Sequence, residues 1–390
     1  MIDVQEAKRR VMANVCLLPS EILPLGNALG RSTGEDINAP FDHPLFHCSA
    51  MDGYAFSMED DVQEWEVVGE LAAGDAFAGR LVRGQCVRIF TGAMMPEGAD
   101  TVVMQERALR NGDRMTHSDT RLQRGGNVRL KGEQLRAGDV TLAKGTFLDA
   151  PAIGLLASVG IHELRVIGTP TVALLISGNE FTGSDIPAPG KIFGSNGIML
   201  QAALRQAGIV SVIIHVKDDP DALITAWKHA AKDHGLIIST GGVSVGDHDM
   251  IRPSLEAAGG EVILHGVMQK PGKPMLFGKI GGKPVFGLPG NPRAVMVLFW
   301  EYVLPFLRAL QGASEVGPRT EYLPVEQAFN IKGDRTEFRA ALVANGKVAL
   351  LADEGSHMLR SLIEANAIAC IPAAVRELKA GDLIEVHYIR

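Results

Sequence analysis

Cysteine is scarce in this chain, and its placement excludes several kinds of site. The 390 residues include 4 cysteines, which are widely separated: Cys16, Cys48, Cys86 and Cys370. No two of them have the short spacing typical of a structural zinc site, a redox dithiol or a small disulfide-stapled domain. We therefore expect reduced, mostly structural thiols in a cytoplasmic protein.

The sequence also lacks a membrane segment and an excess of positive charge. Its most apolar run, residues 294–307, is interrupted by Glu301 and Pro305 and is too short to cross a bilayer. The N-terminal residues form a helical pattern with acidic side chains and do not follow the order of a signal peptide. A net charge of −7 argues against general nucleic-acid binding, so any anion site must be local.

What the chain contains is the composition of an ordinary globular protein, with 46% apolar and 21% charged residues. Its length predicts about two to four domains. Asp3 and Glu6 form a capping-box-like start to an N-terminal helix. Short β-prone runs between glycine-rich turns predict a small β-rich domain over residues 40–142, and the residues after 317 indicate a further β domain.

From Thr171 to Gln311, apolar strands alternate with helices. The expected strands include residues 172–176, 210–216, 235–240 and 261–267, followed by two short strands before residue 288. Asp219-Pro220 marks the start of one helix, and Asn291-Pro292 starts the long one. This alternation predicts a doubly wound, parallel α/β sheet.

Four loops follow the expected strands at the sheet edge where open α/β folds bind ligands: residues 177–180, 217–219, 239–249 and 287–292. Glycines let backbone N–H groups approach a phosphate-like anion, and serine and threonine hydroxyls add donors. The candidate binding residues in these loops are Ser177, Gly178, Ser239, Gly241, Gly242, Ser244, Gly246, Pro289 and Asn291.

Acidic residues accompany the same loops. Carboxylates beside an anion site require a cation between them, and Mg²⁺ prefers such oxygen ligands, which makes Glu180, Asp218 and Asp249 candidate metal ligands. Each feature also has a simpler interpretation. A glycine-rich loop is often only a tight turn, and Asp219, Asn291 and Asp249 suit helix N-caps. The functional interpretation depends on their meeting at one sheet edge.

Residues 270–274, KPGKP, place two ammonium groups on a stiff turn. In isolation a solvated hairpin is the better interpretation. At the same sheet edge, however, Lys270 and Lys273 become a candidate clamp for an oxyanion. In the β-rich region, the composition of residues 49–54 favours a simple turn, and residues 88–93 are similarly ambiguous. His43, His47 and Cys48 lack convincing zinc spacing.

Together these runs resemble the molybdopterin molybdenumtransferase family, which includes the C-terminal domain of gephyrin. The matching segments are SAMDGYA (49–55), RIFTGAMMPEGAD (88–100), SGNE (177–180), STGGVSVGDHD (239–249), KPGKP (270–274), GLPGNP (287–292) and GSHML (355–359). They follow the family's order across nearly the whole chain. Each segment alone is a weak signal, but the combination is highly specific.

The resemblance implies a homodimer whose subunits each have four domains in an L shape. A first domain would comprise residues 1–37 and 141–168, with the β-rich domain inserted between them at 38–140. An α/β domain similar to the adenylyl-transferring molybdopterin-binding fold would span 169–312, and a β-barrel-like domain would span 313–390. The active site would lie between the α/β domain of one subunit and the β-rich domain of the other.

The implied reaction cleaves adenylylated molybdopterin and inserts molybdenum from molybdate into its dithiolene, releasing AMP, with Mg²⁺ assisting. A transient contact with the adenylyltransferase of the pathway is also implied, with no role for nucleic acid or membrane. Carried over by position, the catalytic residues would be Asp52, Thr91, Glu180, Asp218 and Asp249, and those handling molybdate would be Lys270, Lys273 and Ser356.

The chain departs from the family pattern at several of these places. Residues of the usual type are replaced by Gln134, Gly194, Gly266, Ala294 and Ala340, while Arg339 and Arg360 appear where they are not usual. These departures leave two alternatives open beside the insertase. One is a paralogue that acts on another oxyanion such as tungstate, or that only hydrolyses the adenylate. The other is a non-catalytic carrier that binds molybdopterin and delivers it to a partner enzyme.

Overall fold

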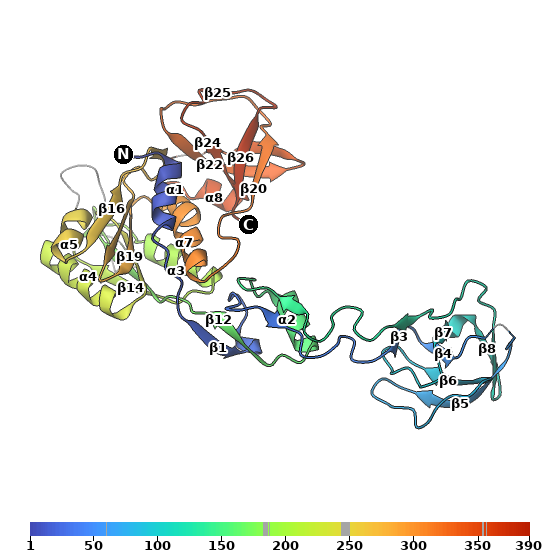
Figure 1. The fold of residues 1–390 in the computed structure, drawn as a ribbon. Helices are drawn as coiled ribbons and strands as arrows, with labels where there is room; N and C mark the ends of the chain where they lie inside the picture. The colour runs from blue at the N-terminus through green and yellow to red at the C-terminus, as the bar shows by residue number, and fades with distance from the viewer. Residues whose placement is uncertain (60, 182–185, 187, 243–249, 353–354, 356) are drawn as a thin grey trace.

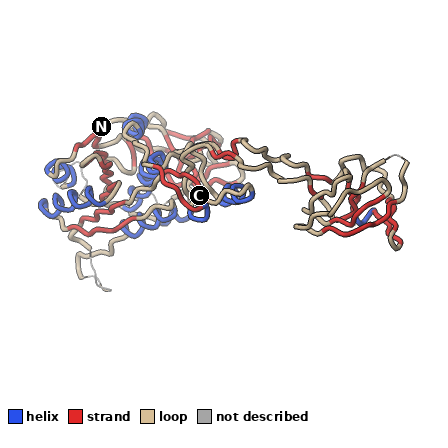
Figure 2. Tube along the Cα trace, turned by 60° about the horizontal axis from the view of Figure 1, so that its bottom comes forward, coloured by secondary structure: helices blue, strands red, loops and turns tan. Residues whose placement is uncertain are grey.

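The computed structural model describes residues 1–59, 61–181, 186, 188–242, 250–352, 355 and 357–390. The molecule is elongated, with the β-rich domain at one end and the α/β and C-terminal domains together at the other (Figure 1). Two extended segments that run beside each other connect the ends, as a second direction of view also shows (Figure 2). Within the described residues, no helix is long and apolar enough to span a membrane.

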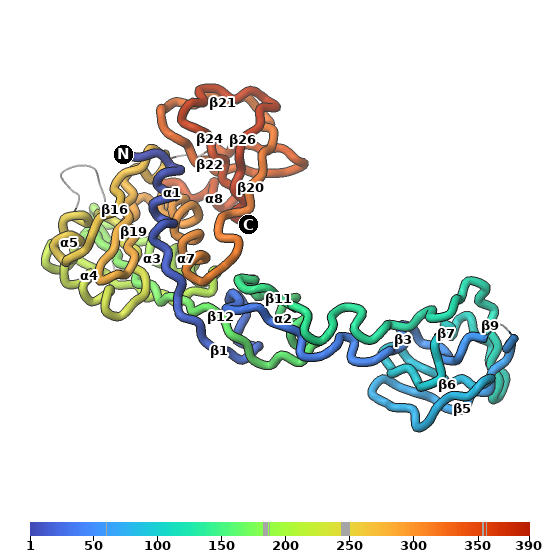
Figure 3. Tube along the Cα trace, viewed as in Figure 1, coloured from blue at the N-terminus to red at the C-terminus, as the bar shows by residue number. Residues whose placement is uncertain are grey.

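Between the two ends lies a small unit built from segments far apart in the sequence. Strand β1 (Ser20–Pro24) pairs antiparallel with β12 (Glu163–Ile167), and β2 (Ile37–Asn38) pairs with β11 (Val140–Leu142). Figure 3 shows these blue and green parts of the chain side by side. Helix α2 (Ala150–Ser158) completes the unit and begins where Asp149 accepts a hydrogen bond from the Ala152 amide at 2.9 Å.

The β-rich domain contains a six-stranded sheet in the order β7-β4-β6-β5-β9-β8. Its strands are β4 (Gly53–Phe56), β5 (Trp65–Leu71), β6 (Gln85–Ile89), β7 (Thr101–Met104), β8 (Ala108–Asn111) and β9 (Arg114–His117). A short pair, β3 (Cys48–Ser49) and β10 (Val128–Arg129), lies where the connecting segments enter the domain. Apolar side chains on the two faces of the sheet form two separate small cores.

The α/β domain has a six-stranded sheet in the order β14-β13-β15-β19-β18-β16. Strands β13 (Val172–Ser177), β14 (Ser211–Val216), β15 (Leu236–Thr240) and β19 (Lys283–Leu288) are parallel. Strand β18 (Leu276–Ile280) is antiparallel to β19 and to β16 (Glu261–His265). The predicted sheet is therefore present but mixed, because one strand reverses direction through a tight hairpin at Gly281 and Gly282.

Helices cover both faces of this sheet, as a doubly wound fold requires. Alternate residues of β13 enter different cores: Leu174 and Ile176 face one, and Ala173 and Leu175 face the other. Helix α3 (Asn196–Gln206) and the long helix cover the first face, while α4 (Pro220–Asp233) and α5 (Ile251–Ala257) cover the second. The long helix consists of α6 (Pro292–Leu298), a π-helical turn at Phe299–Val303, and α7 (Leu304–Leu310). The N-terminal helix α1 (Val4–Met12) also packs on this first core.

The C-terminal domain is a sheet in the order β17-β22-β24-β26-β20, in which β23 also pairs with β22. Its strands are β20 (Thr320–Pro324), β22 (Thr336–Ala344), β23 (Lys347–Leu350), β24 (Ala367–Ile371) and β26 (Leu383–Tyr388), with a helix α8 (Arg360–Glu364) and the short pair β21 (Phe329–Asn330) and β25 (Glu377–Leu378). The edge strand β17 (Gln269–Lys270) comes from the α/β domain and runs parallel to β22. The KPGKP turn is thus part of the joint between the two domains.

Candidate functional site

The loops after β13 and β14 are joined at the carboxyl edge of the α/β sheet. The Asn179 amide donates to the Asp218 carboxylate at 3.1 Å, and the Asp218 amide donates to the Asn179 side-chain oxygen at 3.4 Å. The Lys191 ammonium group donates to the Asn179 carbonyl at 2.5 Å. This reciprocal pair fixes the distance between the loop that bears Glu180 and the loop that bears Asp218.

The loops after β15 and β19 pack against the first loop. A Cβ atom on Gly241 would lie 2.3 Å from the Ser177 carbonyl oxygen, so only glycine allows this approach, and its φ of +91° has the same requirement. From α3, the Asn196 side-chain amide donates to the Gly290 carbonyl at 2.8 Å and to the Thr240 hydroxyl at 3.3 Å. The described parts of all four predicted loops therefore lie at one edge of the sheet.

The predicted binding residues occupy different depths in this edge. Ser177 and Ser239 are 2% and 0% exposed, and neither hydroxyl has a hydrogen-bond partner among the described residues. Gly178, Gly242, Pro289 and Asn291 lie in the loops themselves, and Glu180 is exposed. Asp219 is confirmed as a helix cap, because its carboxylate accepts from the Ala222 amide at 2.8 Å. Four predicted residues lie outside the described residues: Ser244, Gly246, Asp249 and Ser356.

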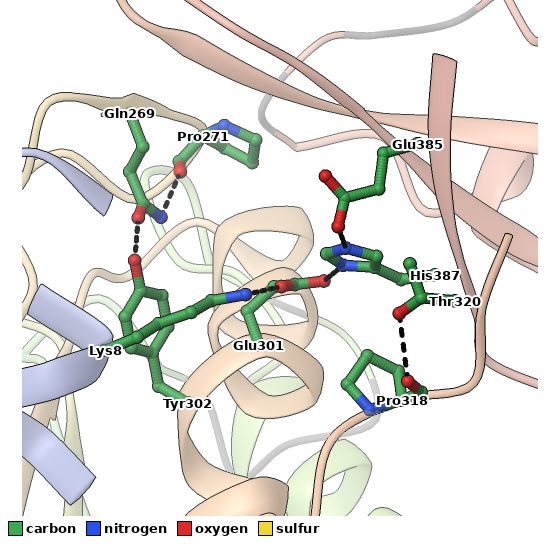
Figure 4. A network of polar contacts seen from close by, with 9 residues as sticks. All are labelled: Lys8, Gln269, Pro271, Glu301, Tyr302, Pro318, Thr320, Glu385 and His387. Atoms are coloured by element: carbon green, nitrogen blue, oxygen red, sulfur yellow. Dashed lines mark hydrogen bonds and ion pairs between the residues drawn. The ribbon is translucent and has the colours of Figure 1, made fainter. Parts of the chain in front are cut away.

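The KPGKP turn is held by a buried polar chain that begins on the long helix. The Tyr302 hydroxyl donates to the Gln269 side-chain oxygen at 2.5 Å, and the Gln269 amide nitrogen donates to the Pro271 carbonyl at 3.0 Å (Figure 4). Gly272 has a φ of +89°, and a Cβ there would lie 2.9 Å from Leu298. The turn therefore has one packed conformation and is not a freely solvated hairpin.

Beside this turn is a cavity of about 340 Å³, within the size range of small-molecule sites. Among the described residues that line it, four side chains are cationic and none is acidic: Lys270, Lys273, Arg293 and Arg335. Pro289 and Asn291 also line it, so the cavity is continuous with the loop after β19. The positive charge is local, in a chain whose net charge is −7. A small oxyanion is the ligand that this lining suits.

Arg293 and Arg335 were not singled out from the sequence. Arg293 is only 1% exposed, and its guanidinium donates to the Ser361 hydroxyl at 2.6 Å. Arg335 comes from the C-terminal domain, and its guanidinium donates to the Gln269 carbonyl at 3.3 Å. The one available signal was an arginine directly after Gly290-Asn291-Pro292, at the first turn of a helix that follows a candidate binding loop.

The structure also shows what stands at the unusual positions of the C-terminal domain. Ala340 is 0% exposed in the shared core, whereas Arg339 lies on the other face of β22, with its guanidinium 3.1 Å from the Glu337 carboxylate and over the Phe329 ring. Arg360 has a side chain 81% exposed and pairs with Glu364 at 3.3 Å. Neither arginine lines the cavity. The buried arginine that lines the cavity is Arg293.

In the β-rich domain, the two motifs at residues 49–54 and 88–93 meet. The Asp52 carboxylate accepts hydrogen bonds from the Thr91 amide at 2.8 Å and from the Thr91 hydroxyl at 2.7 Å. These bonds, the amide first, and the nearby charge of Arg88 hold the pKa of Asp52 below its ordinary value. The strand beside it is tightly packed, since a Cβ on Gly53 would lie 1.8 Å from the Val103 carbonyl oxygen.

Asp52 and the α/β loops belong to opposite ends of the same chain (Figure 1). One subunit therefore does not bring together Asp52 and Thr91 with Glu180 and Asp218. The carboxylate of Asp52 is nonetheless exposed enough to meet a ligand or a second chain.

Comparison with known proteins accounts for the chain in three consecutive parts. Residues 2–160 match the MoeA N-terminal region (domains I and II), residues 173–309 match a probable molybdopterin binding domain, and residues 322–389 match the MoeA C-terminal region (domain IV). A molybdopterin molybdenumtransferase of Staphylococcus epidermidis is 33% identical over 400 residues, which cover 99% of this chain and 95% of the relative. The chain belongs to the molybdopterin molybdenumtransferase family.

Other members of the family agree with this assignment. The molybdopterin molybdenumtransferase of Staphylococcus aureus strain COL is also 33% identical, over 398 residues covering 99% of this chain and 95% of the relative. The crystal structure of the molybdopterin biosynthesis moeA protein from Pyrococcus horikoshii OT3 superposes with a TM-score of 0.84 at 27% identity, covering 100% of both chains. The family and the fold predicted from the sequence are confirmed. The protein is a transferase of molybdenum cofactor biosynthesis.

Proposed function

We propose that this molybdopterin molybdenumtransferase inserts molybdenum from molybdate into adenylylated molybdopterin and releases AMP. The observation that carries the proposal is the cationic cavity beside the loop after β19. This cavity suits a small oxyanion, and it adjoins a sheet edge that suits a phosphate-bearing ligand. The two sites share Pro289 and Asn291, which would place the metal oxyanion next to the pterin.

The sheet edge supports binding of the pterin phosphate. Backbone N–H groups around Gly178, Gly241 and Gly242 can approach an anion closely because these residues carry no side chain. The hydroxyl of Ser177 and the side-chain oxygen of Asn196 are buried and find no partner among the described residues. Buried polar atoms without a partner are costly, so a polar ligand at this edge would stabilise both.

The carboxylates at the edge fit a hard divalent cation. Glu180 and Asp218 supply oxygen donors from two loops that the Asn179–Asp218 hydrogen bonds hold together. They, with Asp249, would hold Mg²⁺, which when bound would polarise the phosphoanhydride and help AMP to leave. The residues of the chain orient the adenylate, and the cavity orients molybdate.

In the cavity, Lys270 and Lys273 of the turn and Arg293 of helix α6 would hold the oxyanion. The buried guanidinium of Arg293 has a fixed position, because Ser361 accepts its hydrogen bond. Molybdate held next to the dithiolene reacts as if it were highly concentrated, and this proximity is the main contribution of the protein to the insertion step. Ser356 remains a proposed contact of the same anion.

We propose that Asp52 and Thr91 complete this site in a homodimer. The supporting observation is the separation of their domain from the α/β loops of the same chain, together with a lowered pKa that keeps the Asp52 carboxylate ionised. Assembly in the cytoplasm with a transient contact to the adenylyltransferase would let the adenylylated intermediate pass directly between enzymes.

The test is incubation of the purified protein with adenylylated molybdopterin, Mg²⁺ and either molybdate or tungstate, while AMP and metallated cofactor are measured. The proposal requires both products with molybdate. AMP without metallated cofactor would indicate a hydrolase, and metallation only with tungstate would indicate the other oxyanion. Tight binding with neither product would indicate a carrier.

A further inference from the structure

Three side chains with metal-binding atoms lie together on one face of the C-terminal sheet, and none of them lines the cationic cavity. Cys370 on β24 is directly opposite Glu385 on β26, and His387 is two residues further along β26 on the same face. The Cys370 sulfur, a Glu385 oxygen and a His387 ring nitrogen all lie within 4.8 Å of one another. Cys370 and His387 are 9% and 4% exposed, whereas the Glu385 side chain is 31% exposed and is therefore the ligand that solvent reaches.

A second group of side chains orients the histidine. The Glu301 carboxylate lies 2.7 Å from His387 Nδ1, which leaves His387 Nε2 directed at Glu385, 3.1 Å away (Figure 4). Glu301 is fully buried and is held in turn by the Lys8 ammonium group at 2.6 Å. It lies in the π-helical turn of the long helix, and turns of this kind are frequent at functional sites.

We propose that Cys370, Glu385 and His387 bind one divalent transition-metal ion of the zinc class. The ion would connect the C-terminal sheet to the long helix through His387 and Glu301. The fourth position of the ion would be filled by water from the Glu385 side, because solvent reaches that side chain.

The chemistry of the donors supports this assignment. Sulfur, imidazole nitrogen and carboxylate oxygen are the three ligand types of protein zinc sites. Histidines that bind zinc almost always direct their other nitrogen to a carboxylate, a backbone carbonyl or water, and Glu301 provides a carboxylate here. A thiolate and the Glu385 carboxylate carry two negative charges, which balance a divalent ion. The charge of Glu301 is already balanced by Lys8, so no buried charge remains uncompensated.

The donor set also distinguishes this cluster from the active-site carboxylates. Glu180 and Asp218 offer oxygen alone, which suits Mg²⁺, whereas a thiol and an imidazole favour softer ions. Zn²⁺ and Co²⁺ should therefore bind at Cys370 even in the presence of excess Mg²⁺.

The test is titration of the full-length, reduced, metal-stripped protein with Co²⁺ in the presence of excess Mg²⁺, followed by visible and near-ultraviolet absorption. The expected result is a thiolate-to-cobalt charge-transfer band that saturates at one ion per chain and disappears when Zn²⁺ is added. Cys370→Ser and His387→Gln should each lose the band, while circular dichroism verifies their fold. Cys86→Ser and Cys16→Ser are matched controls and should retain it.

A further variant tests the outer carboxylate. Glu301→Gln leaves the three ligands in place and should weaken Zn²⁺ binding by about 10- to 100-fold, the usual effect of losing such a partner. The proposal is overturned if the unmodified protein gives no sulfur-to-cobalt band, or if Cys370→Ser retains the band of the unmodified protein. Each readout is independent of the transferase reaction, so a failure of the proposed function would not affect it.

Discussion

The guanidinium of Arg293 on α6 donates a 2.6 Å hydrogen bond to the Ser361 hydroxyl on α8, across the joint between the α/β and C-terminal domains. Both side chains are almost completely buried, at 1% and 2% exposed. A buried arginine with this support presents a fixed positive charge to the cavity that it lines.

We therefore expect Arg293→Met to raise the KM for molybdate by about 10- to 100-fold, since hydrogen bonds to charged groups contribute about 1.5–3 kcal/mol. The KM for adenylylated molybdopterin should change little, because we propose that the sheet-edge loops bind that substrate. Steady-state kinetics with each substrate varied in turn measures the two effects. Arg360→Ser is the control, since that exposed side chain lies outside the cavity. Equal effects on both substrates would contradict this role of Arg293.

The Asp52–Thr91 contact gives a prediction about pH. Its two hydrogen bonds stabilise the charged carboxylate and lower its pKa, so Asp52 should remain ionised throughout the neutral and weakly acidic range. Thr91→Val removes the hydroxyl donor and keeps the amide, so the pKa of Asp52 should rise towards its ordinary value without reaching it. A carboxyl carbon NMR titration, with Asp52→Asn to identify the signal, measures this change. An unchanged titration would show that the hydroxyl does not contribute.

The proposed sharing of the site between two subunits predicts complementation between two inactive variants. Asp52→Ala inactivates the half-site of the β-rich domain, and Lys270→Ala inactivates that of the α/β domain. After random re-association, about half of the dimers are mixed, and each has one intact site out of two, so about a quarter of the original activity should return. AMP release measures it, with each variant alone as the baseline. If both residues acted within one subunit, the mixture would stay inactive.

The α/β fold could be predicted from the sequence because its signals are local. Alternating apolar strands and helices, and the Asp219-Pro220 start of α4, depend on neighbouring residues. The direction of β18 is not encoded in its apolar pattern. The sequence therefore predicted the sheet but not that this one strand runs antiparallel to its neighbours. The Gly281-Gly282 pair was a usable signal, since both residues have positive φ, as a two-residue hairpin turn requires.

The cavity could be predicted only in part, because it depends on contacts between distant segments. Lys270 and Lys273 form a visible motif, whereas Arg335 reaches Gln269 from 66 residues along the chain. Arg293 acquires its position from Ser361, 68 residues away. Neither relationship leaves a pattern in the local sequence. The same holds for Cys370, Glu385 and His387, which strand pairing brings together.

The buried cluster of Lys8, Glu301 and His387 predicts a dependence of stability on pH. Burial raises the pKa of Glu301, but the hydrogen bond from His387 and the charge of Lys8 lower it below its ordinary value. Burial lowers the pKa of His387, but the hydrogen bond to Glu301 and its charge raise it above its ordinary value. The contribution of Glu301 to the free energy of unfolding is thus lost as pH falls through its lowered pKa. The contribution of His387 is lost as pH rises through its raised pKa.

The stabilisation by this cluster should therefore be greatest between those two pKa values. In metal-free protein near neutral pH, Glu301→Gln should lower the free energy of unfolding by about 3–5 kcal/mol, because it leaves partners of a buried ion pair uncompensated. Urea unfolding across pH measures the difference, which should shrink towards both acid and alkaline pH. Glu321→Gln is the control on the same domain, since the Glu321 side chain is 34% exposed and its partner Arg319 is 73% exposed. A difference that is constant with pH would exclude the cluster as its source.

The packing of the loop after β15 against Ser177 gives the last prediction. Gly241 and Gly259 both have a φ of +91°, but a Cβ on Gly241 would lie 2.3 Å from the Ser177 carbonyl oxygen, whereas nothing lies within 4 Å of a Cβ on Gly259. Alanine at either position carries the same backbone strain of about 1–3 kcal/mol, and only Gly241→Ala must also displace the first loop. Gly241→Ala should thus lower the melting temperature more than Gly259→Ala does. It should also abolish tight binding of molybdopterin, measured by calorimetry, while Gly259→Ala binds normally. Equal pterin affinity in the two variants would mean that the close contact between the loops is not needed for the binding site.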